Sequence, residues 1–165
     1  MRKPGIFLAA LAMVIGSLAV PTTAAAASNN CNHEQGGVAL PRSADSLEGG
    51  IGSVQLCIDS SKRVWAYVVL YQPMPAGRWG NVWLRRYYEG FLTGEFSCNG
   101  EPGGNGYVKP GQTRCWTPKV AGSEANVEFK ALSWVYRGTY PNEDWSVAFG
   151  MTLACSAATG ACRDA

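Results

Sequence analysis

Apolar and polar residues alternate with a period of two along most of the chain beyond residue 50, and this period predicts β-strands. The alternation is most extended between Arg63 and Tyr88, where one stretch at 63–71 and another at 81–88 flank a loop with Pro and Gly. In the first stretch, and as far as Leu84 in the second, every second position holds an aliphatic residue, and the positions between hold mostly aromatic residues and arginines. We expect the two strands to form the central hairpin of a sheet, with the aliphatic side in the core. The aromatic side is then either a second core layer or a binding surface.

Shorter alternating stretches predict further strands. The segment 54–58 precedes a polar link, so it should pair with the strand that begins at Arg63 as an antiparallel hairpin. A short helical turn at 43–47 is consistent with Ser43 as its cap. Large and small residues alternate over 145–154, which predicts a central strand that is closely approached on its small side. The remaining strands are expected at 91–98, 112–120 and 127–136.

The first residues have the pattern of a secretory signal peptide. Arg2 and Lys3 precede an uncharged apolar run at 6–20, and alanines at 24–27 provide cleavage sites. About 15 apolar residues are too few for a membrane span, which needs ~20. We therefore expect a cleaved leader at 1–27, no membrane anchor and a single secreted, extracellular β domain at 28–165. The alanine-rich composition of the leader indicates a bacterial source.

Cleavage of this leader changes the charge of the chain. The full sequence has 14 Lys and Arg against 12 Asp and Glu, and loss of Arg2 and Lys3 leaves 12 of each. A formally neutral domain has no excess of positive charge for a polyanion. Nucleic acid is therefore not an expected partner.

Six cysteines in an exported chain favour disulfides over metal ligation or thiol chemistry. We expect neighbours in sequence to pair: Cys31–Cys57, Cys98–Cys115 and Cys155–Cys162. Together with about eight short strands and no long helix, this predicts an all-β fold. The expected architecture is an antiparallel β-sandwich or barrel of about eight strands, stapled by disulfides.

Residues suited to catalysis are sparse. The single histidine, His33, lies in a polar N-terminal arm, and the sequence has no G-x-S-x-G motif. We assign no catalytic residue, no metal site and no cofactor, since the cysteines are expected to be oxidised. A carboxylate-based hydrolase would need two acids beside the scissile bond. Glu89 and Glu95 are the best-placed pair, although solvated surface charge is the commoner role of such acids.

Aromatic residues offer a better candidate for function. The chain has six tryptophans and seven tyrosines, and Trp, Tyr and Arg are the usual hot-spot residues of binding surfaces. The aromatic parity of the 63–88 region, with its loop, supplies the candidate ligand-binding residues Trp65, Tyr67, Trp79, Trp83, Arg85 and Tyr87. The alternative is that these aromatic side chains pack against a second sheet, although the arginines among them are costly to bury without partners.

Three hypotheses about function follow. The first is a secreted, non-catalytic binding protein that recognises a glycan, a cell-wall component or a protein through the aromatic surface. The second is an inhibitor or toxin-like protein that binds its partner through the Cys98–Cys115 loop, with Tyr107 and Lys109 exposed. Pro110 after Lys109 would block recognition of a scissile bond, so this hypothesis ranks lower. The third is the carboxylate-based hydrolase, and an enzyme is the least favoured class.

Overall fold

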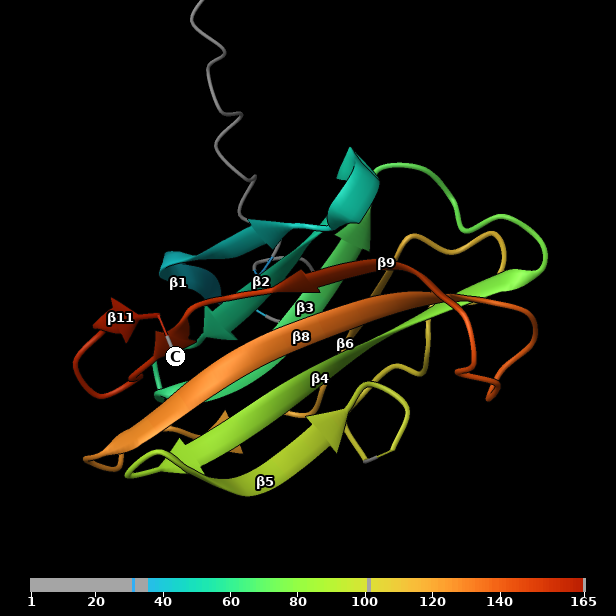
Figure 1. Ribbon diagram of the computed structural model, residues 1–165. Helices are drawn as coiled ribbons and strands as arrows, with labels where there is room; N and C mark the ends of the chain where they lie inside the picture. Colours follow the sequence, from blue (N-terminus) through green and yellow to red (C-terminus); the bar gives the residue numbers. More distant parts are fainter. Residues whose placement is uncertain (1–30, 32–35, 101, 165) are drawn as a thin grey trace, which may run out of the picture.

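The structure is a computed structural model that describes Cys31, residues 36–100 and residues 102–164. The leader at 1–27 and His33 lie outside the described residues, so the predictions about them stay predictions. Apart from one 3-10 turn, η2 (Glu48–Gly50), the regular elements are strands in two antiparallel sheets (Figure 1). The predicted all-β class is confirmed.

The two sheets share no strand. The first sheet has the order β1-β2-β3-β6, with β7 also pairing with β3. Its strands are β1 (Val38–Ser46), β2 (Gly52–Ile58), β3 (Arg63–Leu70), β6 (Arg114–Trp116) and β7 (Val120–Ala121). The second sheet has the order β11-β10-β8-β4-β5, and β9 pairs with β8 on the edge away from β4. Its strands are β4 (Arg78–Tyr88), β5 (Phe91–Ser97), β8 (Val127–Arg137), β9 (Ser146–Met151), β10 (Ala154–Cys155) and β11 (Cys162–Arg163).

The expected hairpin between 63–71 and 81–88 is wrong. β3 pairs with β2, β6 and β7, whereas β4 pairs with β5 and β8. Residues 71–77 cross from one sheet to the other, shown as the green loop at the right of Figure 1, and they form a longer link than the two to five residues of most hairpin loops. Val68 and Leu84 are both buried in the same core. The aliphatic side chains of β3 and β4 therefore face each other across the core from opposite sheets, and their aromatic side chains point away from each other.

Of three further predictions about local structure, one is confirmed and two are wrong. β2 and β3 form the predicted antiparallel hairpin, with Gly52 opposite Leu70 and Ile58 opposite Val64. The helical turn at 43–47 is wrong, because most of that segment extends β1, and the 3-10 turn η2 follows it. The segment 145–154 is also not central, since β9 pairs only with β8.

The small side of β9 is closely approached, as its alternation predicted. A Cβ placed on Gly150 would come within 2.8 Å of the Leu47 side chain and 3.2 Å of the Ser46 carbonyl oxygen. The absence of a side chain at this position allows the chain after β1 to pack onto the second sheet. Close contact here joins the two sheets along one edge.

Three disulfides join the neighbouring cysteines, as expected: Cys31–Cys57, Cys98–Cys115 and Cys155–Cys162. Between the sheets lies an aliphatic core that includes Val54, Leu56, Val82, Phe129 and Val135. None of the described segments forms a helix with the length and hydropathy that a membrane crossing requires.

Candidate functional site

The outer side of the second sheet carries an aromatic surface across three neighbouring strands. Because Val82 and Leu84 of β4 point into the core, Trp83 between them points outward. The same parity places Trp134 of β8 and Phe149 of β9 on the outer side, and these two residues are direct register partners. Strand alternation thus brings together side chains from distant parts of the sequence.

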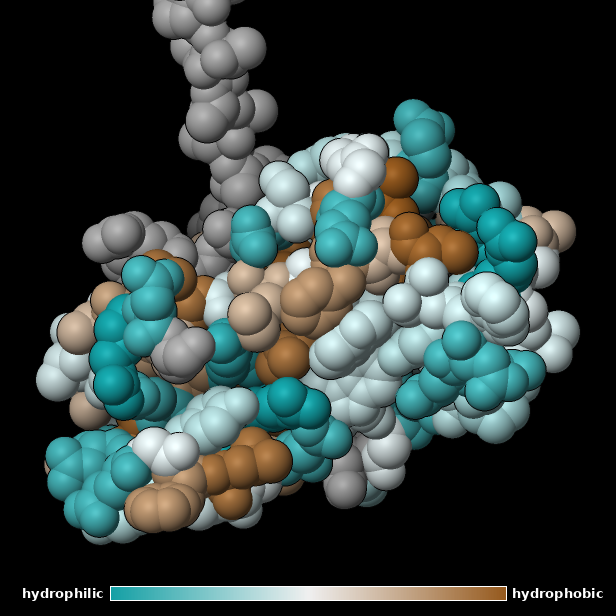
Figure 2. All heavy atoms as spheres, in the orientation of Figure 1, coloured by the Kyte–Doolittle hydropathy of each residue, from teal (hydrophilic) through white to brown (hydrophobic). Residues whose placement is uncertain are grey.

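We define the outer aromatic face as Trp83, Trp134, Phe149 and Met151. The ring centroids of Trp83 and Trp134 are 5.0 Å apart with planes at 83°, and those of Trp134 and Phe149 are 4.8 Å apart. The three aromatic side chains are half-buried, and Met151 is 37% exposed. In Figure 2, weakly polar and apolar surface runs diagonally across the visible face, with hydrophilic residues on both sides. The rings hold one another in place and keep part of their surface open to solvent.

A second group of aromatic side chains continues this side of the sheet at the start of β4. Trp79 is buried and stacks on its register partner Tyr136, with centroids 4.5 Å apart. Tyr107 and Tyr140 stack on each other at 4.2 Å and both meet Trp79 edge-on. The Trp79 indole N–H donates to the Asn142 carbonyl oxygen at 3.0 Å. This packing supports the end of the outer aromatic face and makes Trp79 structural.

Burial also controls the chemistry of Tyr136. Desolvation, with a smaller contribution from the negative charge of Glu143, raises the pKa of Tyr136 to about 12. Its hydroxyl is thus harder to deprotonate than that of an exposed tyrosine, whose ordinary pKa is 10.0. Tyr136 is not a candidate general base.

Charged residues border the outer aromatic face on the side of β5. The guanidinium of Arg85 donates to the carboxylate of its register partner Glu95 at 2.6 Å. This hydrogen bond raises the pKa of Arg85, with partial burial opposing the shift. Lys130 lies opposite Arg85 on β8. The border can therefore donate and accept hydrogen bonds beside the aromatic rings.

Two of the predicted binding residues lie on the other sheet, away from this site. Trp65 and Tyr67 belong to β3 of the first sheet and are both 0% exposed. They pack with Trp116 and the Cys31–Cys57 disulfide in a second apolar cluster outside that sheet. A ligand cannot reach them in this conformation, so the prediction of one shared aromatic surface is wrong. The reason is the separation of β3 and β4 into different sheets.

Trp83, Arg85 and Tyr87 do lie together on β4, and all three are half-buried. Trp134, Phe149 and Met151 were missed as candidates. Their alternation in 127–136 and 145–154 was visible in the sequence, but their place beside β4 depends on strand pairing.

The loop between Cys98 and Cys115 lies against the second sheet. Val108 is buried, and its backbone exchanges two hydrogen bonds with Gly80 of β4, at 3.0 and 2.8 Å. Tyr107 is half-buried in the aromatic stack, while Lys109 is exposed, with its ammonium 5.4 Å from the Tyr107 ring centroid. Of the two predicted contact residues, Lys109 is thus the more exposed.

Glu89 and Glu95, the acidic pair that the sequence singled out, have different surroundings. Glu95 is engaged by Arg85, and Glu89 lies in the turn before β5. No group of three or more His, Cys, Asp or Glu side chains that could hold a metal occurs in the described part of the chain.

Comparison with protein-family models, with curated proteins and with solved structures finds no match to this chain. The outer aromatic face is therefore interpreted from its geometry alone.

Proposed function

We propose that this chain is a secreted, non-catalytic binding protein that recognises a glycan through the outer aromatic face. The observation that carries the proposal is the row of half-buried rings of Trp83, Trp134 and Phe149 on three paired strands. Large aromatic side chains held on strands lose little conformational entropy when a ligand binds. Open aromatic surface on a folded domain is typical of a recognition site.

A glycan suits both parts of this surface. A sugar ring has an apolar face of C–H groups, which can stack on an indole or phenyl ring, and a rim of hydroxyls. Arg85, Glu95 and Tyr87 stand next to Trp83 on β4 and β5 and can hydrogen-bond such hydroxyls. A formally neutral mature domain also favours an uncharged ligand over a polyanion.

Secretion belongs to the same proposal. Three disulfides are typical of proteins that work in an oxidising compartment. The pattern at 1–27 is that of a cleaved leader. A cell-wall or other extracellular polysaccharide is then the glycan that the protein would meet.

Retention on insoluble polysaccharides tests this proposal. Purified protein is mixed with peptidoglycan, chitin and cellulose, and the bound fraction is measured for wild type, Trp83→Ala and Trp134→Ala. At least one polysaccharide should retain the wild type, and each substitution should weaken retention tenfold or more, because truncating a hot-spot aromatic residue costs about 2 kcal/mol or more. Phe91→Ala is the matched control, since Phe91 is 76% exposed but lies at the β4–β5 turn.

Circular dichroism and the melting temperature must show that the variants remain folded. Unchanged retention in folded Trp83→Ala and Trp134→Ala proteins would reject the outer aromatic face as the site. Capture of a protein partner that is lost in Lys109→Ala, with both tryptophan variants unaffected, would favour the Cys98–Cys115 loop instead.

A further inference from the structure

We propose that a hollow at one end of the two sheets binds an amphiphilic anion, that is, an alkyl chain with a carboxylate or phosphate head group. The hollow lies beside residues 71–77, where the chain crosses from β3 to β4, and has a volume of about 480 Å³. This volume is in the range of small-molecule sites. Leu70 and Val135 of its wall belong to the inner sides of the sheets, so the site is separate from the outer aromatic face.

Apolar side chains form most of the wall. Leu70, Met74 and Val135 are buried at its base, and Ile51 is 36% exposed at its rim. Pro73 completes the side formed by the crossing loop. An alkyl chain gains free energy for each methylene group that it transfers from water to such a surface.

Backbone hydrogen bonds hold the crossing loop in position without a ligand. Tyr71 N donates to Ile51 O at 3.0 Å, and Met74 N donates to Gln112 O at 2.8 Å. Gly138 N donates to Gly77 O at 2.7 Å, which ties the end of the loop to the segment after β8. A hollow formed in advance costs the ligand little ordering entropy.

Two arginines stand together at this end of the second sheet. Arg78 lines the hollow, and Arg137 is its register partner on β8. Like charges at directly opposite positions on paired strands repel each other. Neither forms an ion pair with any residue that the structure describes, whereas four other arginines pair with Asp or Glu: Arg63, Arg85, Arg86 and Arg163.

The arginine pair and the apolar wall together define the ligand. A carboxylate or phosphate between Arg78 and Arg137 would relieve the repulsion and accept charge-assisted hydrogen bonds from both. Because the wall beside Arg78 is apolar, an anion with an alkyl chain should bind more tightly than a small anion. An uncharged alkyl molecule would leave the two cations without a partner.

Isothermal titration calorimetry with octanoate, octyl phosphate, octan-1-ol and acetate tests the proposal. Octanoate or octyl phosphate should bind at least tenfold more tightly than octan-1-ol, and acetate should give no binding. The two anionic probes distinguish a carboxylate from a phosphate head group. Arg78→Gln should reduce the affinity for the preferred anion tenfold or more, and Arg137→Gln provides a second variant at an exposed position.

Arg114→Gln is the matched control. Arg114 is also half-buried and lines a hollow, but that hollow lies beside Trp116 of the first sheet. Octanoate should shift the backbone amide resonances of Ile51, Met74 and Val135, and the Trp83→Ala protein should bind octanoate normally.

Equal affinity for octanoate and octan-1-ol would overturn the proposal, as would no binding of either anion at millimolar concentration. Unchanged affinity in the folded Arg78→Gln and Arg137→Gln proteins, or resonance shifts confined to another region, would also overturn it.

Discussion

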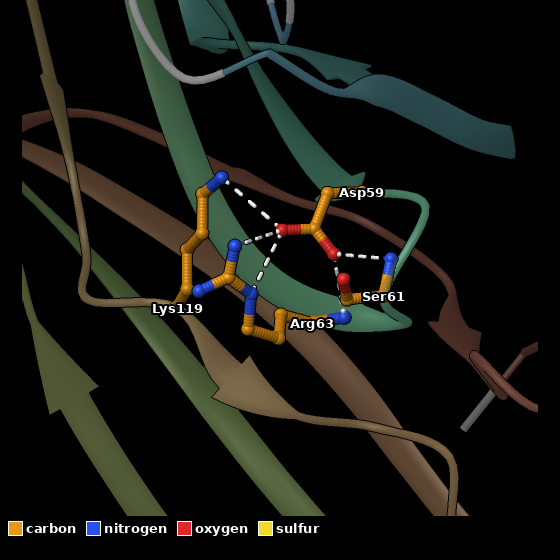
Figure 3. A network of polar contacts seen from close by, with 4 residues as sticks. All are labelled: Asp59, Ser61, Arg63 and Lys119. Carbon is orange, nitrogen blue, oxygen red and sulfur yellow. Dashed lines mark hydrogen bonds and ion pairs between the residues drawn. The ribbon is translucent and has the colours of Figure 1, made fainter.

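Asp59 shows how a single side chain can hold a turn and join it to a distant segment. In Figure 3, one oxygen of its carboxylate faces the side chains of Arg63 and Lys119, and the other faces the backbone of Ser61 and Arg63. It accepts hydrogen bonds from the backbone N–H groups of Ser61 and Arg63, both at 3.0 Å, and lies 2.8 Å from Arg63 Nη2 and 3.2 Å from Lys119 Nζ. Burial acts to raise the pKa of Asp59, but the hydrogen bonds from Arg63 and Lys119 and the charge of Arg63 outweigh it and hold the pKa below its ordinary value.

A lowered pKa in the folded state gives Asp59 a pH-dependent contribution to stability. The unfolded chain takes up this proton more readily, so the contribution is complete above the ordinary value of 3.8 and disappears as the pH falls through the folded-state value. Asp59→Asn should lower the free energy of unfolding at pH 7 by about 1–3 kcal/mol. Urea denaturation at several pH values should show this difference shrinking below about pH 4. Asp144→Asn, at an exposed position, is the control, and a difference that does not change with pH would contradict the assignment.

At the scale of elements, a threonine side chain completes the hydrogen bonding at each of two interrupted strands. Between β6 and β7, the Thr117 hydroxyl accepts a hydrogen bond from Ala66 N at 3.0 Å and donates to Pro118 O at 3.1 Å. Between β9 and β10, the Thr152 hydroxyl accepts from Ala131 N at 3.0 Å and donates to Leu153 O at 2.8 Å. Each hydroxyl thus satisfies a backbone N–H of the neighbouring strand at the point where regular pairing is interrupted.

Removing either hydroxyl should leave a buried backbone N–H without its acceptor. Thr117→Val and Thr152→Val keep the shape of the side chain, and each should lower the free energy of unfolding by about 1–3 kcal/mol. Amide hydrogen exchange should accelerate at Ala66 in the first variant and at Ala131 in the second. Thr139→Val, at an exposed position, should change neither property. Wild-type stability in both buried variants would show that the hydroxyls are dispensable.

At the scale of the whole molecule, the chain has two aromatic sides with different roles. Trp65 and Tyr67 on the first sheet are enclosed, with the Cys31–Cys57 disulfide and Trp116 packed on them. Trp83 and its neighbours on the second sheet remain partly open. One side is closed to solvent, and the other keeps the partly exposed aromatic surface on which the proposed glycan binding rests.

Removal of the Cys31–Cys57 disulfide should expose the enclosed side. This bond spans 26 residues, so replacing both cysteines by alanine should lower the free energy of unfolding by about 3–4 kcal/mol. Acrylamide quenching of tryptophan fluorescence should increase as Trp65 loses its cover. The Cys155→Ala/Cys162→Ala protein is the control: its disulfide spans only 7 residues, so the loss should be about 2 kcal/mol without added quenching. Equal quenching in the two double variants would contradict a covering role for Cys31–Cys57.

Local regularities in the sequence predicted the strands and the disulfides. The alternation at 63–70 and 127–136 is a local property, because it compares side chains two positions apart. It therefore located β3 and β8 without knowledge of the strands that pair with them. The expectation that cysteines pair with their neighbours in sequence, as Cys31 does with Cys57, is confirmed for all three disulfides. The polar link before Arg63 predicted the β2–β3 hairpin in the same way.

The assignment of β3 and β4 to different sheets was settled only by the tertiary structure. Val68 and Leu84 would be buried if β3 and β4 paired as a hairpin, and they are buried with the two strands in opposite sheets. The alternation in the sequence is therefore the same for both arrangements. The choice depends on pairing with β6 and β8, which are remote in the chain. That choice enclosed Trp65 and left Trp83 beside Trp134, and it placed the candidate site on one side of the second sheet.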